Sequence, residues 1–249
     1  MNLVRALPEV TPPPIVEPNP SSTATVTASR IPAAVALRGA ANMPLRPASA
    51  EAPVSGTRRS FAKGEELFAE GDAADFFYKV VSGTVRTCKL LSDGRRQIDA
   101  FHLASDVFGL ESGQDHGFTA EAVEDVIVEA YRRSHFASLL HVNAAFGEQL
   151  MSSMLRNLER AHEHMVLLGR KTAQEKMATF LLDMAGRTTK TDRIDLPMQR
   201  TDIADHLGLT IETVSRTLTQ MVRDGLIKLA AAGRTIILAD KAGLQELNA

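Results

Sequence analysis

The chain has 249 residues, enough for two ordinary domains, and 44% of them are hydrophobic, as expected for a protein with packed cores. The formal net charge is −2, so no whole-molecule basic field attracts nucleic acid and any DNA contact must come from a local surface. One cysteine, Cys88, excludes a disulfide within the chain and a cysteine-based iron–sulfur or zinc site.

No apolar run approaches the roughly 20 residues that span a bilayer, and prolines between Pro8 and Pro20 interrupt any signal-peptide core. We therefore expect a cytoplasmic protein without a membrane segment. Ten of the 11 prolines precede residue 54, and no aromatic residue precedes Phe61. This composition predicts a disordered extension over residues 1–57. A transit peptide is the alternative, although the prolines oppose an amphipathic helix; a start at Met43, which would remove residues 1–42, is a further hypothesis.

Residues 58–140 combine short apolar runs with turn residues, as in the run from Phe76 to Val81. This pattern predicts a small antiparallel β-domain. The segment Ser92–Arg95 contains Asp-Gly, which readily supplies the positive φ angles of a tight hairpin turn.

Residues 141–170 contain neither proline nor a turn cluster, which predicts a long helix. Phe146, Leu150 and Met154 form one apolar row that would pack on the β-domain. A second set recurs at alternating spacings of four and three, the pattern of a helical seam, and predicts a homodimer; the alternative is a monomer with a wide buried stripe. This seam consists of Met151, Leu155, Leu158, His162 and Met165.

Residues 171–249 carry mainly helical signals. Thr172 and Glu175 have capping-box spacing, and an apolar face follows them up to Met184. Two short helices, Asp202 to Leu207 and Ile211 to Arg223, then precede a hairpin formed by residues 226–229 and 235–238.

The two short helices have the signature of a helix-turn-helix. Ala204 allows a close approach, Gly208 permits a sharp turn, and Val214 fills the angle between the helices. The alternative is a helical hairpin without a nucleic-acid role, but the hairpin that follows favours a winged DNA-binding domain.

Thr210 is placed to cap the second helix, whose first turns would enter the major groove of double-stranded DNA. Arg216 suits guanine, and Glu212 suits an exocyclic amine of cytosine or adenine. A surface ion pair between these two residues is the alternative interpretation. The predicted base-reading residues are Ile211, Glu212, Ser215 and Arg216, and the predicted phosphate contacts are Thr210, Thr213, Lys228 and Arg234.

From Phe61 to the C-terminus, the sequence resembles the CRP/FNR family of transcription regulators. The resemblance implies an α+β protein with an N-terminal antiparallel β-roll, a cyclic-nucleotide-binding-like jelly roll, followed by a long dimerisation helix and a C-terminal winged helix-turn-helix. The segment from Glu212 to Arg216 is similar to the FNR and FixK branch. Ile211 stands where the catabolite activator branch typically has an arginine, and an apolar side chain there would suit a thymine methyl group.

The resemblance further implies a regulator, not an enzyme, that activates low-oxygen-related genes at palindromes of TTGAT-type half-sites, with RNA polymerase as a partner. Cyclic-nucleotide-binding relatives have a glutamate and an arginine where Leu110 and Phe118 stand. Between Ser105 and Ala130 there is no Lys or Arg, so we expect no cyclic nucleotide effector. The cysteines of oxygen-sensing FNR members are also absent, so we expect no iron–sulfur cluster and no other cofactor.

In the alternative interpretations, a single cysteine or histidine carries the sensing chemistry. Cys88 would act as a redox switch if its thiolate were accessible, or else it is a small strand hydrophobe. Haem bound by His102, His116 or His135 is a second alternative. A cupin-like enzyme is a remote third, but His162 and His164 would point to different sides of a helix, so no metal site is predicted.

Overall fold

A computed structural model describes residues 56–188, 192–230 and 234–248, all within the compact unit Ala48–Ala249. The extension predicted for residues 1–57 lies almost wholly outside these residues, as does the hypothesis of a start at Met43. Among the helices of the described ranges, none is long and apolar enough to cross a membrane.

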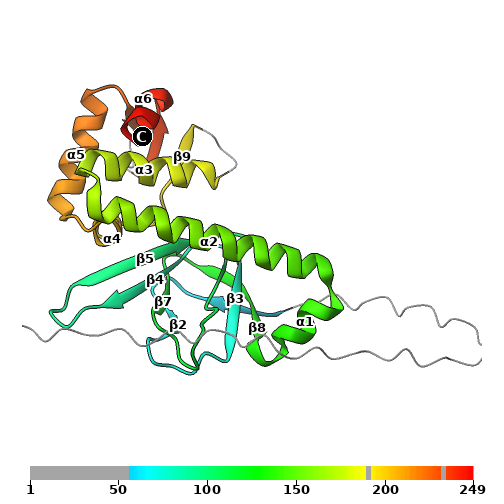
Figure 1. Cartoon of the computed structure of the whole chain (residues 1–249). Helices are drawn as coiled ribbons and strands as arrows, with labels where there is room; N and C mark the ends of the chain where they lie inside the picture. The colour runs from blue at the N-terminus through cyan, green and yellow to red at the C-terminus, as the bar shows by residue number, and fades with distance from the viewer. Residues whose placement is uncertain (1–55, 189–191, 231–233, 249) are drawn as a thin grey trace, which may run out of the picture. The chain divides into compact units, whose positions relative to one another are not determined.

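The predicted antiparallel β-domain is present as two four-stranded sheets (Figure 1). Alternating apolar residues such as Val80, Val126 and Val128 are buried in it. Gly94, at φ 83°, forms the predicted hairpin turn. The first sheet has the order β1 (Thr57–Phe61), β8 (Val126–Arg132), β3 (Phe76–Ser82), β6 (Val107–Phe108), and the second β2 (Glu66–Phe68), β7 (Thr119–Ala122), β4 (Val85–Leu90), β5 (Arg96–His102).

The helical segment after the sheets differs from the prediction in where it begins. A short 3₁₀ turn, η1 (Arg133–His135), and helix α1 (Phe136–Val142) precede the long helix α2 (Ala144–Arg170). The break falls at Asn143, which adopts an extended conformation so that its side chain can accept the backbone N–H of Phe146 at 3.0 Å. An N-capping asparagine thus divides what the sequence pattern predicted as one helix.

One face of α2 packs on the β-domain, as predicted for Phe146 and Leu150. Leu150 is 3% exposed and shares a core cluster with Phe77 and Tyr131, while Phe146 packs against this cluster. Met154 does not join that core: its side chain is 40% exposed, so the predicted row is correct for two of its three members.

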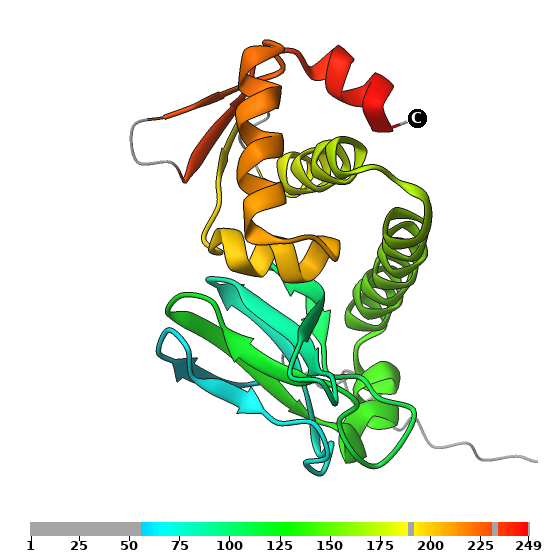
Figure 2. The same cartoon turned by 90° about the vertical axis from the view of Figure 1, so that its left-hand side faces the viewer.

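The C-terminal part begins with α3 (Ala173–Gly186), which has the predicted capping box of Thr172 and Glu175. The helices α4 (Arg200–Leu207) and α5 (Ile211–Arg223) follow. The predicted hairpin, β10 (Ile227–Leu229) with β11 (Thr235–Leu238), is joined by β9 (Arg193–Asp195) in a sheet of order β10-β11-β9 (Figure 2). The sequence reading missed β9 and the terminal helix α6 (Lys241–Asn248), whose Leu244 is fully buried.

Candidate DNA-binding site

A tight turn and a packed wedge fix the angle between α4 and α5. Gly208 ends α4 at φ 61°, a left-handed conformation that favours glycine. Ala204, Leu207, Val214 and Leu218 are all buried where the two helices meet. The angle is therefore set by core packing, which gives α5 a defined orientation within its domain.

The start of α5 presents the predicted base-reading residues to solvent. Thr210 caps the helix by accepting the backbone N–H of Thr213 at 3.1 Å. Glu212, Arg216 and Ile211 are exposed, and Ser215 is half-buried. The opposite face is buried in the domain core (Figure 2), through Val214, Thr217, Leu218 and Met221.

No ion pair between Glu212 and Arg216 is present in the described part of the chain. Both side chains are exposed and lie one turn apart on α5, so their polar groups remain available to an external partner. This arrangement gives no support to the alternative in which the two residues serve only as a surface salt bridge.

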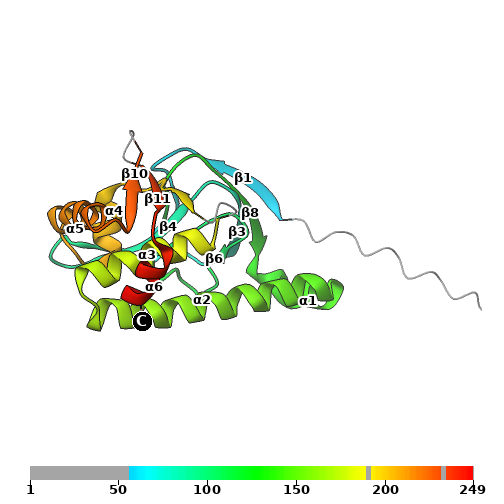
Figure 3. The ribbon, with the colours of Figure 1, turned by 90° about the horizontal axis from the view of Figure 1, so that it is seen from above.

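The predicted phosphate-contacting residues fall into two groups. The hydroxyls of Thr210 and Thr213 lie 3.0 Å apart at the start of α5, directly beside the base-reading positions. Lys228 lies exposed on β10 and Arg234 lies exposed just before β11, so both belong to the wing hairpin (Figure 3). The structure therefore places one pair at the reading helix and the other on the wing.

Arg200 is a cationic residue that the sequence reading missed. It is the first residue of α4, and its Nη1 donates to Ser215 Oγ at 3.2 Å, which brings a second guanidinium beside the reading helix. The predicted helix began two residues later, at Asp202. The available signal was that Asp202 stands three residues after Gln199, whose backbone N–H it accepts at 3.1 Å.

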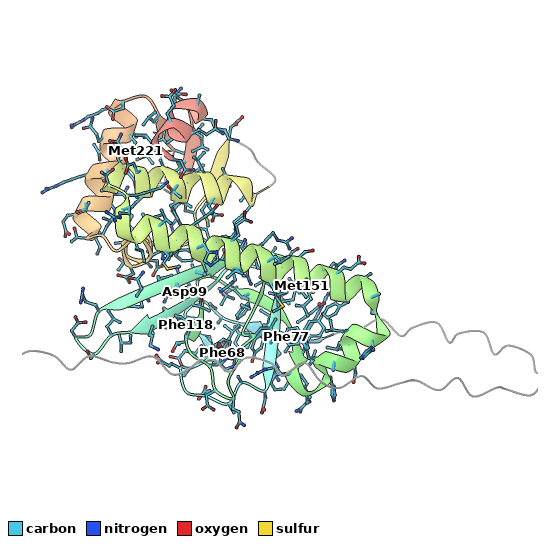
Figure 4. The ribbon with its side chains drawn as sticks, viewed as in Figure 1. Phe68, Phe77, Asp99, Phe118, Met151 and Met221 are labelled. Atoms are coloured by element: carbon cyan, nitrogen blue, oxygen red, sulfur yellow. The ribbon has the colours of Figure 1, made fainter. Side chains whose placement is uncertain are left out.

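The predicted dimer seam is exposed along α2. Its four apolar members are each more than half exposed, as is the neighbouring Val166, and His162 is also exposed. Figure 4 labels Met151 on this helix. So much apolar side-chain surface on one helix is typical of a surface that another chain covers. The four members are Met151, Leu155, Leu158 and Met165.

A cavity of about 410 Å³ lies between the β-domain, α2 and α3. Leu110 and Phe118 line it, so neither the carboxylate nor the guanidinium that the family resemblance associates with cyclic nucleotides is supplied at these positions. Asp99 lines the cavity as well (Figure 4), and burial raises the pKa of its carboxyl group. This wall of the cavity is apolar and acidic.

Two arginines from outside residues 105–130 also reach the cavity. Arg160 of α2 and Arg187 after α3 both donate to Asp106, and Arg187 donates further to the backbone oxygen of Phe101 at 2.6 Å and to Asp183 at 3.1 Å. Burial alone would raise the pKa of Asp106, but the two guanidiniums and the backbone N–H of Leu103 hold it below its ordinary value. Both arginine charges are thus already neutralised within the chain.

Cys88 is a buried side chain of β4, in the core cluster that this part of the β-domain shares with the C-terminal helices. It is 4% exposed, and burial together with the nearby Glu121 carboxylate raises the pKa of its thiol to about 11. The thiolate is therefore scarce at neutral pH, which argues against the redox-switch alternative and favours the interpretation as a small hydrophobe.

The three histidines considered as haem ligands have different surroundings. His102 lines the cavity and lies 3.1 Å from Thr87 Oγ1, whereas His116 stacks on Phe68 with ring centroids 3.6 Å apart. His135 is exposed in η1. Within the described ranges, no group of three or more His, Cys, Asp or Glu side chains could hold a metal ion.

His206 of α4 is packed against several elements. Its ring stacks on His164 with centroids 4.2 Å apart, and its Nδ1 lies 3.1 Å from the backbone oxygen of Ile98. Burial lowers the pKa of His206 to about 3 and that of His102 to about 4. Both imidazoles are therefore neutral at physiological pH.

A β-roll, a long helix with an exposed seam and a winged helix-turn-helix with a solvent-facing reading helix together define a DNA-binding transcription regulator. A family model of the cyclic nucleotide-binding domain matches residues 58–143, and a model of the Crp-like helix-turn-helix domain matches residues 175–247. The chain belongs to the CRP/FNR family, and within it to the FixK-like branch.

The relatives support this placement over most of the chain. The nitrogen fixation regulation protein FixK of Azorhizobium caulinodans is 44% identical over 214 residues, covering 84% of this chain and 86% of the relative. FixK of Rhizobium meliloti is 40% identical, with 79% and 90% covered. The structure of FixK2 from Bradyrhizobium japonicum matches with a TM-score of 0.72 and 46% identity, covering 78% of this chain and 98% of that one.

His102, which is buried, and His206, which is partly buried, predict a loss of stability in acid because both imidazoles are neutral in the folded chain. Between about pH 6.5 and pH 4 the unfolded chain takes up protons at His102 and His206 that the folded chain does not, so the free energy of unfolding falls as the pH falls. Each histidine contributes a slope of up to about 1.4 kcal/mol per pH unit. Urea unfolding at several pH values should show that His206→Asn, which keeps a donor for Ile98, has a shallower pH dependence than wild type.

The matched control is His135→Asn, because this histidine is exposed. Its pH dependence should follow wild type, since the carboxylates that also titrate in this window are the same in both proteins. Equal slopes for wild type and His206→Asn would contradict the assignment of a neutral imidazole.

Proposed function

We propose that this regulator is a homodimeric, cytoplasmic transcription activator that reads a palindrome of TTGAT-type half-sites and works with RNA polymerase. The observation that carries the proposal is the exposed start of α5, where Ile211, Glu212 and Arg216 face solvent with Ser215 beside them. Relatives include FixK proteins named for nitrogen fixation regulation and FnrL of Cereibacter sphaeroides, named a transcriptional activator protein, at 36% identity. Genes expressed at low oxygen are the targets that this branch suggests.

Base recognition follows from the chemistry of the exposed side chains. Arg216 donates two hydrogen bonds to guanine O6 and N7, and Glu212 accepts from the amine of cytosine or adenine. Ile211 offers an apolar surface to a thymine methyl group. The residues that would hold the phosphates, and so set the position of α5, are Thr210, Thr213, Lys228 and Arg234, to which we add Arg200.

Dimerisation follows from the exposed seam of α2. The apolar surface there runs along a helix that is anchored to the β-domain by Leu150 on another side. Two copies packed along this seam would present two reading helices to two half-sites, about 34 Å apart in a helix-turn-helix dimer. In this proposal residues 58–140 form the β-roll, 141–170 the dimerisation segment and 171–249 the DNA-binding domain.

The acidic and apolar cavity supports a regulator without a cyclic nucleotide or an iron–sulfur effector. An anionic phosphate entering it would meet Asp99 and Glu111, while Arg160 and Arg187 are already bound to Asp106. Haem at His102 remains the alternative, because this histidine lines the cavity. An absorption spectrum of the purified protein distinguishes a regulator that binds haem from one that does not.

Substituting Arg216 tests base recognition. Arg216→Ala should lose about 1 to 3 kcal/mol of discrimination at the guanine of each half-site, because one bidentate donor is removed. Binding to a set of operators with each base changed in turn, measured by fluorescence anisotropy, gives this preference.

Arg223→Ala is the matched control, since Arg223 is an exposed arginine two turns further along α5. It should keep the guanine preference of wild type. If Arg216→Ala kept that preference as well, the base-reading assignment would be wrong.

Placing a charge in the seam tests dimerisation. Leu155→Glu should shift the protein to a monomer in sedimentation experiments and weaken operator binding strongly, because two carboxylates would face each other in an apolar interface. Leu90→Glu, at a more exposed leucine on β4, is the control that should remain dimeric. A Leu155→Glu protein that stayed dimeric would place the interface elsewhere.

Cyclic AMP should leave the protein unaffected. Thermal unfolding with 1 mM cyclic AMP should give the same midpoint as with AMP, whereas a ligand with a micromolar dissociation constant would stabilise the fold by about 4 kcal/mol at that excess. Calorimetry that detected micromolar cyclic AMP binding would refute this part of the proposal.

A further inference from the structure

The hairpin of β4 and β5 in the β-domain is bound to the first helix of the helix-turn-helix by a cluster of charged side chains. Arg86 Nη1 donates to Asp202 Oδ1 at 2.9 Å, and Arg96 Nη2 donates to the same oxygen at 2.7 Å. Arg96 also contacts Asp205 Oδ2 at 2.8 Å, and Arg86 Nε donates to Glu121 of β7 at 2.7 Å. We call these five residues the clamp; α4 lies beside β5 in Figure 1.

The clamp is sheltered from solvent. Its side chains are between 6% exposed, for Asp202, and 26% exposed, for Arg96. Ion pairs in such positions are screened by salt much less than surface pairs. The clamp should therefore be less sensitive to salt concentration than exposed ion pairs are.

Backbone contacts extend the clamp along α4. Gln97 Nε2 donates to the backbone oxygen of His206 at 3.2 Å, and His206 Nδ1 lies 3.1 Å from the oxygen of Ile98. The hairpin thus contacts α4 at Asp202, at Asp205 and at His206, which spans more than one helical turn. Contacts spread over this length restrict rotation of the helix as well as its separation from the β-domain.

The clamp contains more carboxylates than guanidiniums, so its stability depends on both arginines. Two guanidiniums lie among three carboxylates, those of Glu121, Asp202 and Asp205. Without the arginines, three carboxylates would remain close together at the junction and would repel one another. Loss of both arginines should therefore loosen the attachment of α4 to the hairpin, leaving the hydrogen bonds of Gln97 and His206 and the apolar cluster that contains Ile98 and Ile203.

The clamp orients the reading helix without covering it. Glu212 and Arg216 of α5 are exposed while the clamp is formed, and α5 is fixed to α4 by the buried wedge around Val214. The clamp does not bury the reading residues, so it leaves them accessible to DNA. Because α2 also packs on the β-domain, the clamp links the orientation of α5 to the helix that carries the dimer seam.

We propose that Arg86 and Arg96 are positioning residues for DNA recognition: by holding α4 against the β4–β5 hairpin, they set the separation of operator half-sites that the dimer accepts. This inference rests on the proposed function, since it assumes a dimer that reads a palindrome. It adds a determinant of specificity that lies in the β-domain and touches no base.

The test compares wild type with the Arg86→Gln/Arg96→Gln double variant on palindromic operators whose half-sites are separated by the native spacing or by two additional base pairs. Wild type should prefer the native spacing by about tenfold or more, because the added pairs shift one half-site by about 7 Å and rotate it. The double variant should bind the native operator less tightly and should prefer it by less than about threefold.

A second readout separates positioning from damage to the reading helix. Replacing the guanine in both half-sites of the native operator should weaken wild type and the double variant by the same factor, since α5 is intact in both. Arg95→Gln is the matched control, because Arg95 is the neighbouring arginine but is exposed and pairs with Asp93 in the hairpin turn. It should behave as wild type in both measurements.

A milder variant covers the case in which the double variant does not fold. Asp205→Asn removes one of the charges that pair with Arg96 and leaves the contacts of Asp202 with Arg86 and Arg96 in place. It should reduce the preference for native spacing in the same direction and by a smaller factor. If the variant that folds kept the spacing preference of wild type, the proposal would be overturned.

Two other results would also overturn the proposal. Tighter binding of the native operator by the double variant would make the clamp inhibitory, and loss of guanine preference would mean that it acts through the structure of α5. A wild-type protein that ignored every inverted repeat would instead refute the proposed function, and this is seen before any variant is compared.

Discussion

The architecture depends on a single helix, α2, that carries two apolar surfaces, one packed on the β-domain and one exposed. Along α2, Leu150 is buried against the β-domain, whereas Leu155 and Leu158 are exposed on the seam. A helix turns 100° per residue, so its side chains point in all directions around the helix axis. One apolar row can therefore be buried against the β-domain while a neighbouring row stays free for another partner. The β-domain and the DNA-binding domain are both attached to this helix. Its two surfaces therefore determine where each reading helix stands relative to the symmetry axis of the proposed dimer.

Features that depend on neighbours in the chain could be predicted from the sequence. The turn at Gly94, the capping box at Thr172 and the bounds of α5 each follow from residues within a few positions of one another. The break at Asn143 was missed because an asparagine between apolar helical segments has no periodic signal of its own. Strand β9 is only three residues long and pairs with β11 at separations of 40 to 44 positions, so its pattern is too short to be recognised.

The candidate site was predicted unevenly for the same reason. The exposed positions of Ile211, Glu212 and Arg216 at the start of α5 could be predicted because a cap and a helical period place them there. Arg86 contacts Asp202 across 116 positions, and Arg187 contacts Asp106 across 81. Charged partners at such separations share no spacing rule, so no local pattern reveals them. Residues 105–130 contain no arginine, and the part of the cavity wall that they form has none. The sequence of this segment could not reveal the arginines that α2 and the end of α3 supply.

Asp106 shows what the shared use of one carboxylate implies for the cavity. It accepts Arg160 from the long helix and Arg187 from the end of α3, while it also accepts the backbone N–H of Leu103 in its own loop. A molecule that drew either guanidinium away from Asp106 would have to break contacts that join three segments of the chain. Its affinity would be lowered by the free energy needed to break those contacts. For such a ligand, thermodynamic reciprocity requires that binding weakens the junction to the same extent as the junction weakens binding.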